Sequence, residues 1–266
     1  MYLKLPIKTL CLTLVLSNTT VIAAEQPSLS AHSGKNTTAI LELYTSEGCS
    51  NCPQAEKYLS QLIKKHSQTK LFIPLAFHVD YWDYMGWEDP YSKPEHGTRQ
   101  REIAARNKLN TLYTPQFVLY GRDFPAHKNI PEAITIINNI KPHANIKLDA
   151  QLNNNRILAT KIAIEANNER AQWNSNIYIA ITEDQLTSSV TRGENNGLLL
   201  QHQHVVRRLI GPMQMQGKKK IKIDKKITLN PEWRLDKLSL IVFAKDSING
   251  STHQSLQVAL HPLQIE

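Results

Sequence analysis

Residues 45–53 read Thr45-Ser46-Glu47-Gly48-Cys49-Ser50-Asn51-Cys52-Pro53, and they join an apolar run at Ala39–Tyr44 to a helical pattern. After Pro53, apolar residues recur at steps of three and four, which is one face of an amphipathic helix. These residues are Ala55, Tyr58, Leu59, Leu62 and Ile63. The C-x-x-C motif is therefore predicted at a strand-to-helix junction, with proline in the first turn, where its missing N–H costs little.

The position of Cys49 and Cys52 favours thiol chemistry. A thiolate is the reactive form of cysteine, and the free amides and positive dipole end of a helix N-terminus stabilise it. With two residues between the sulfurs, Cys52 can resolve a mixed disulfide formed at Cys49. The motif predicts a redox-active Cys49–Cys52 disulfide. Two other interpretations stay open: an inert structural disulfide, and half of a zinc site, although structural zinc takes four ligands.

The first 24 residues have the pattern of a secretory signal peptide. Lys4 and Lys8 precede a short apolar run at Thr9–Leu16, and the segment closes on small residues at Ala23 and Ala24. A polar segment, residues 25–38, follows without periodicity and is predicted to be a flexible lead-in. We therefore expect a bacterial periplasmic or secreted protein with no stable membrane insertion after cleavage.

Composition narrows the classes of partner. The 266 residues carry a formal net charge of +8, and a basic run at Lys218–Lys226 supplies much of it. Alternation of Lys with Ile221 and Ile223 in this run predicts a strand with one solvated face. Because aromatic residues do not interleave with the lysines, no nucleic-acid binding is expected.

A second strand is predicted at Leu71–Val79, which would form a βαβ unit with the first strand and the dithiol helix. Pro74 cannot donate to a sheet, so a bulge or an unpaired edge is expected there. The carboxyl ends of parallel strands share one sheet edge, which places His78, Asp80 and Trp82 near Cys49. His78 and Asp80 are candidates for a proton shuttle or metal ligands, or for hydrogen-bonded loop structure.

The C-x-x-C-P motif, the two strands and a Thr-Pro step leading into a third strand resemble the thioredoxin fold. More narrowly, the chain resembles the secreted thioredoxin-like family catalogued as domain of unknown function 1223. The motifs that carry this resemblance are Glu42–Cys49, Phe77–Asp83, Arg99-Gln100, Tyr113–Gln116 and Arg192–Asn195.

The resemblance implies further site residues. Glu42 takes the place of a buried acid that accepts the proton of the resolving thiol, with its pKa raised by burial; a solvated edge glutamate is the alternative. Thr114 and Pro115 would present backbone to an extended substrate. Apart from the resemblance, Trp82 belongs to an aromatic stretch that would line an apolar rim for a peptide substrate or pack in the core. No cofactor is expected, and no residues are assigned to a metal site.

The chain from residue 144 on shows about seven strand patterns, including a hairpin around Asn153–Asn155 and one strand at Leu198–Val206 that places His202 and His204 on one face. The predicted fold class is α/β, a thioredoxin-like domain at 39–143 followed by an all-β, sandwich-like domain at 144–266. The predicted function is exchange of disulfides with protein or small thiols through Cys49 and Cys52. The alternatives are a secreted binding module with a structural disulfide, and metal handling by Cys49, Cys52 and His78.

Overall fold

A computed structural model describes residues 27–66, 71–125 and 129–263. Strands make up 42% of these residues and helices 22%. In chain order, the strands of the described residues are β1 (Ser28–His32), β2 (Ala39–Thr45), β3 (Phe72–His78), β4 (Gln116–Leu119), β5 (Arg122–Asp123), β6 (Ala144–Leu152), β7 (Ile157–Ala166), β8 (Ser175–Glu183), β9 (Leu186–Ser189), β10 (Leu199–His202), β11 (Val205–Gln214), β12 (Lys220–Thr228), β13 (Leu238–Asp246) and β14 (Thr252–Ala259). The helices are α1 (Cys52–His66), α2 (Pro94–Arg106), α3 (Ile130–Asn138) and α4 (Glu169–Trp173), with short 3-10 turns η1 (Asp83–Met85), η3 (Leu235–Lys237) and η4 (His261–Leu263).

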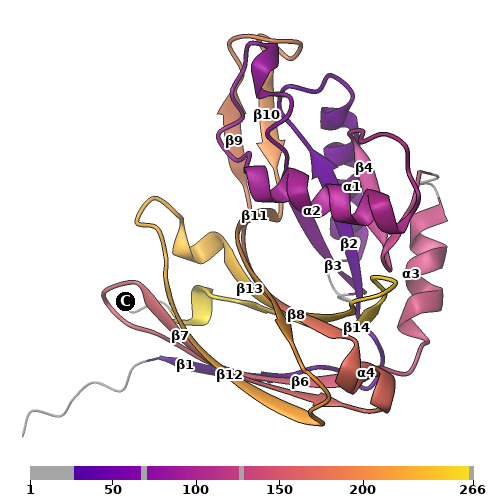
Figure 1. Ribbon diagram of the computed structural model, residues 1–266. Coiled ribbons are helices and arrows are strands. Elements are labelled where there is room, and N and C mark those ends of the chain that lie inside the picture. The colour runs from indigo at the N-terminus through magenta and orange to yellow at the C-terminus, as the bar shows by residue number, and fades with distance from the viewer. Residues whose placement is uncertain (1–26, 67–70, 126–128, 264–266) are drawn as a thin grey trace, which may run out of the picture.

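The strands form two large sheets and one small one. The largest has eight strands in the order β14-β13-β8-β11-β3-β2-β4-β5, and the second has four in the order β1-β6-β7-β12. The hairpin of β9 and β10 is a separate two-stranded sheet. In Figure 1 the four-stranded sheet lies at the bottom of the view, while α1, α2 and the β9–β10 hairpin occupy the top.

Strand alternation distributes side chains of the eight-stranded sheet between three cores. In β2, Ile40 and Tyr44 face a central core, whereas Leu41 and Leu43 face a core shared with α1 and α3. In β8 and β13, one set of side chains enters the same central core, and the alternate set packs on the four-stranded sheet. The central core therefore draws side chains from both halves of the chain.

The predicted fold class is wrong. An α/β, thioredoxin-like domain with a separate β-domain was expected, but the described chain is mostly β and has a sandwich-like, multi-sheet architecture. The reason is edge pairing: β3 pairs in parallel with β2 on one edge and with β11, at Val205 and Ala76, on the other. This contact joins the strands of the first half to β8, β13 and β14 in one sheet.

Two predictions about local structure, one at Pro74 and one for a hairpin, agree with the structure. Pro74 lies on the same edge of β3 as Ala76, whose N–H donates to His204, and β11 pairs with β3 at Ala76 but not at Pro74. The expected unpaired edge at Pro74 is thus confirmed. The hairpin of β6 and β7 around Asn153–Asn155 is also confirmed.

Two segments depart from expectation. The lead-in at 25–38 was predicted to be flexible, but its residues Ser28–His32 form β1, which pairs with β6. The single strand predicted at Leu198–Val206 is two strands, β10 and β11, because His204 adopts a left-handed φ of 53° between them. The predicted signal peptide lies outside the described residues. Within the described ranges, every helix is too short or too polar to cross a membrane.

Candidate functional site

The two cysteines lie where the sequence placed them. Cys52 is the first residue of α1, and it forms a disulfide with Cys49 in the turn that follows β2. The Cys49 N–H donates to the Ser46 carbonyl and the Cys52 N–H to the Cys49 carbonyl, at 3.2 and 3.1 Å, so the turn is held by its own backbone. Both cysteines are buried, Cys49 being 2% exposed and Cys52 fully enclosed.

The loop between β9 and β10 covers the disulfide turn. The side-chain amide of Asn195, which is buried, donates to the carbonyl oxygens of Glu47 and Cys49 at 2.7 and 3.1 Å. The carboxylate of Glu194 accepts the N–H of Ser50 at 3.1 Å. Two side chains from a segment almost 150 residues away in sequence therefore anchor this loop over the cysteines.

A groove of about 580 Å³ runs beside α1, next to the disulfide turn. Its lining is mixed polar and apolar and includes Asn51, Gln54, Tyr58, Tyr113, Pro115 and Phe117. The Thr114–Pro115 peptide bond is cis. The indole N–H of Trp82 donates to Thr114 at 2.7 Å, and a Cβ added at Gly48 would lie 3.1 Å from Trp82. The structure thus brings Thr114, Pro115 and Trp82 together beside the disulfide turn.

Glu42 is buried, as expected, but it is an ion-pair residue. Arg99 from α2 donates two hydrogen bonds to its carboxylate at 3.1 Å, Lys245 from β13 donates one at 2.5 Å and Tyr44 donates one at 3.0 Å. Burial alone would raise the pKa of Glu42, but the charges of Arg99 and Lys245 outweigh it and lower the pKa to about 2. The prediction of a raised pKa is wrong, and a carboxylate that stays ionised in this way is a poor proton acceptor near neutral pH.

His78 is fully buried at the end of β3, and its Nδ1 donates to the Asp89 carboxylate at 2.7 Å. Asp80, the partner considered for it on sequence grounds, lies instead beside Gly97 of α2. Burial would raise the pKa of Asp89, but the imidazole of His78 outweighs it and lowers that pKa. Asp89 also accepts the N–H of Glu47 at 2.9 Å, which ties His78 to the disulfide turn.

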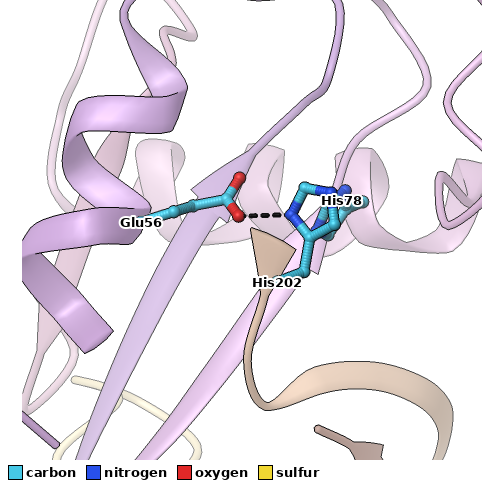
Figure 2. Close-up of side chains that lie close together, drawn as sticks. All are labelled: Glu56, His78 and His202. Atoms are coloured by element: carbon cyan, nitrogen blue, oxygen red, sulfur yellow. Dashed lines mark hydrogen bonds and ion pairs between the residues drawn. The ribbon is translucent and has the colours of Figure 1, made fainter. Parts of the chain in front are cut away.

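His202, at the end of β10, lies between two carboxylates next to His78. Its Nδ1 contacts Glu56 of α1 at 2.5 Å and its Nε2 contacts Glu47 at 2.9 Å. Burial would lower the pKa of His202, but Glu56 and Glu47 outweigh it and raise the pKa to about 10. Figure 2 shows Glu56, His78 and His202 pointing toward one another from three elements. The imidazole rings of His78 and His202 meet edge to face, with centroids 4.9 Å apart.

Sequence reasoning missed Glu56, Asp89 and Asn195 as site residues. Glu56 had a usable signal, because it lies three residues before Leu59 on the apolar face of α1, where an acid needs a partner. Asn195 lies in the Arg192–Asn195 motif, which was noticed without a role. The expectation that His202 and His204 share a face is wrong: His204 is in the turn and its Nδ1 lies 3.3 Å from Asp184.

The chain matches one protein family, and its fold is similar to that of two solved structures described here. A search of curated proteins finds no match. The crystal structure of protein AGR_C_4864 from Agrobacterium tumefaciens is 19% identical, covers 88% of this chain and 99% of its own, and has a TM-score of 0.60. HBP35 of Porphyromonas gingivalis is 13% identical, covers 86% of this chain and 76% of its own, and has a TM-score of 0.61. These likenesses concern the fold alone.

Residues 40–245, which include the disulfide, the covering loop, His78 and His202, match the family described as "Protein of unknown function (DUF1223)". The chain therefore belongs to the DUF1223 family.

Proposed function

We propose that this protein exchanges disulfides with protein or small-molecule thiols through Cys49 and Cys52. The observation that carries the proposal is the disulfide between these residues at the N-terminus of α1. Free amides at a helix N-terminus stabilise a thiolate released there, and this lowers the cost of opening the bond.

The exchange balances without a further reagent. A substrate thiolate attacks the Cys49 sulfur, a mixed disulfide forms, and Cys52 leaves as a thiolate. The second thiolate of the substrate then attacks the substrate sulfur that is bonded to Cys49, and Cys49 leaves as a thiolate. Two electrons pass from the substrate dithiol to the protein, the substrate leaves as a disulfide, and the two cysteine thiolates take up the substrate protons through solvent.

The groove beside α1 supports an extended substrate. Tyr58, Pro115 and Phe117 supply apolar surface, while Asn51 and Gln54 supply hydrogen-bonding groups close to the cysteines. A peptide segment lying there would pass the disulfide turn at the end of the groove lined by Asn51, the residue that precedes Cys52. We also propose, from the leader pattern of residues 1–24 and the disulfide, that the protein acts in the bacterial periplasm or is secreted.

The covering loop sets a condition on access. Because Cys49 is only 2% exposed, a substrate thiol reaches its sulfur after the Asn195 anchor is displaced. A thiol that binds the groove and the loop together would have this advantage over a small thiol in free solution.

The burial of both cysteines favours a second candidate, a binding protein in which the disulfide is permanent and structural. Trapping separates the two functions. In Cys52→Ser, Cys49 has no resolving partner, so the exchange proposal expects mixed disulfides with substrates that appear on non-reducing gels and vanish on reduction. Cys49→Ser is the matched control, since its remaining thiol is the fully buried one. Absence of adducts in both variants contradicts the exchange proposal and supports the structural disulfide.

A further inference from the structure

His78 has an imidazole nitrogen that the interactions described so far do not use. Its Nδ1 donates to Asp89, and its Nε2 has no hydrogen-bond partner among the described residues, although the side chain is fully buried. Leaving a buried polar atom without a partner is energetically costly. Because Nδ1 carries the proton that is donated to Asp89, the neutral form of this ring would present its lone pair to a ligand on Nε2.

Two further ligand-type side chains surround His78. One ligand-capable atom from each of Glu56, His78 and His202 lies within 4.8 Å of the other two, and all three side chains are buried (Figure 2). Nitrogen and oxygen ligands at a tetrahedral zinc, each about 2 Å from the ion, lie roughly 3.3 Å apart. The ligand atoms therefore need to shift relative to one another by at most about 1.5 Å: the wider pairs draw together, and the Glu56–His202 pair, now at 2.5 Å, moves slightly apart.

Both histidines are oriented from behind by a carboxylate. Asp89 accepts from Nδ1 of His78, and Glu47 lies 2.9 Å from Nε2 of His202. Carboxylates in these positions fix the ring and raise the basicity of the opposite nitrogen, as they do around metal-bound histidines. The nitrogens left for a cation are Nε2 of His78 and Nδ1 of His202, and the second already faces Glu56 at 2.5 Å.

The charge of the cluster also favours a cation. Glu47, Glu56 and Asp89 are buried carboxylates, and their ion pairs within the described residues are made with the two histidines. Three buried acids outnumber the two histidines that they contact, so the cluster has an excess of negative groups in a region of low dielectric. A dication bound between Glu56, His78 and His202 compensates this charge.

We propose that Glu56, His78 and His202 bind one divalent first-row transition cation, through one carboxylate oxygen and two imidazole nitrogens. Two imidazoles and a carboxylate suit Zn²⁺, Fe²⁺ or Co²⁺ rather than Mg²⁺ or Ca²⁺, which prefer oxygen ligands alone. Three protein ligands leave a coordination position open to water or to a small ligand. Glu56 follows Cys52 by one turn of α1, so the cation would lie close to the dithiol without using its sulfurs.

The first test uses the full chain with its disulfide intact. Titration with Zn²⁺ alone, followed by calorimetry and elemental analysis after desalting, is expected to give one ion per chain. Co²⁺ is expected to give the visible spectrum of a nitrogen and oxygen site, without the ultraviolet charge-transfer band of cobalt bound to thiolate. Failure to bind either ion in the micromolar range overturns the proposal, and this result requires no variant to fold.

Variants assign the site. His78→Gln is expected to weaken Zn²⁺ binding by about 100-fold or more, and Asp89→Asn by roughly 10- to 100-fold, the range seen when an outer carboxylate is lost. His253→Gln is the matched control, because His253 is equally buried but lies in β14, and it should bind as the parent does. Unchanged binding by His78→Gln refutes the proposed ligand set.

The double variant C49S/C52S separates this proposal from the redox function. It should retain Zn²⁺ binding, because the sulfurs are not ligands, although it cannot exchange disulfides. Loss of binding in this variant transfers the ion to the cysteines and contradicts the proposal. A protein that binds Zn²⁺ as expected but fails the Cys52→Ser trapping keeps the metal site and loses the exchange function.

Discussion

Glu42→Gln tests the role of the buried acid most sharply, because the substitution keeps the size of the side chain and removes its charge. Arg99 and Lys245 would then remain buried without a counter-charge at the centre of the molecule. Removing one partner of a buried ion pair costs about 3–5 kcal/mol. The pKa gives a similar figure, since its fall from 4.5 to about 2 corresponds to about 3.5 kcal/mol at roughly 1.4 kcal/mol per pKa unit.

The sign of the pH dependence follows from this shift. A carboxylate whose pKa is lower in the folded state stabilises the fold fully above about pH 4.5, and this stabilisation is lost as pH falls toward 2. The difference in unfolding free energy between the parent and Glu42→Gln should therefore be about 3–5 kcal/mol at pH 7 and should narrow below pH 4.5.

Urea unfolding of both proteins at pH 7 and at pH 3, with the disulfide intact, measures this difference. Glu165→Gln is the matched control, because its ion pair with Lys220 has side chains 44% and 54% exposed and should contribute less than about 1 kcal/mol. A loss below about 1 kcal/mol in Glu42→Gln, together with a tenfold slower reduction of the disulfide, would refute the structural role and restore the proton-accepting role.

Three further outcomes follow from other parts of the molecule. Burial lowers the pKa of His253 to about 4, so the protein should lose stability as pH falls from 6.5 toward 4, and His253→Gln should flatten that slope in thermal unfolding scans; an unchanged slope counts against it. Asn195→Ala removes two hydrogen bonds that hold the loop over Cys49, so dithiothreitol should reduce the disulfide about tenfold faster, as followed by thiol alkylation. An unchanged rate would show that the loop is not the barrier to reduction. Gly121→Ala should destabilise the fold by roughly 1–3 kcal/mol, because Gly121 has a φ of +76° and its added Cβ would lie 2.5 Å from the Gly250 backbone; equal stability in urea contradicts this packing.

The sequence could predict those parts of the fold that depend on residues close to one another in the chain. The strand-to-helix position of Cys49 and Cys52, the parallel pairing of β2 with β3 and the unpaired edge at Pro74 depend on residues close in sequence or on one backbone donor. Turn residues likewise placed the β6–β7 hairpin.

The parts that sequence could not predict depend on distant pairing. Periodicity shows that β3 is apolar on both faces, but it does not say which strand will pair with its second edge. The pairing of β3 with β11 was therefore not predicted, and the predicted fold class was wrong. The pKa of Glu42 was judged from its apolar neighbours and from the resemblance to thioredoxin-like proteins. Its pKa is decided by Arg99 and Lys245, which are 57 and 203 residues away in sequence.

The histidine cluster shows the same limit. His78 and His202 were both noted as candidates, but each was assigned to a neighbour two residues away. The turn at His204, with its left-handed φ, separates His202 from His204 and directs β10 toward α1. Glu56 and Glu47 then become partners of His202, a relation carried by the tertiary structure and by no local spacing.

The reduction potential of the Cys49–Cys52 pair, measured by equilibrating the protein against glutathione buffers and counting free thiols, tests the exchange function most directly. The proposal predicts a reversible two-electron transition at about −280 to −120 mV, the range of known exchange catalysts. A potential below about −300 mV, or a disulfide that glutathione does not reduce at all, contradicts the proposal and leaves the bond a structural one.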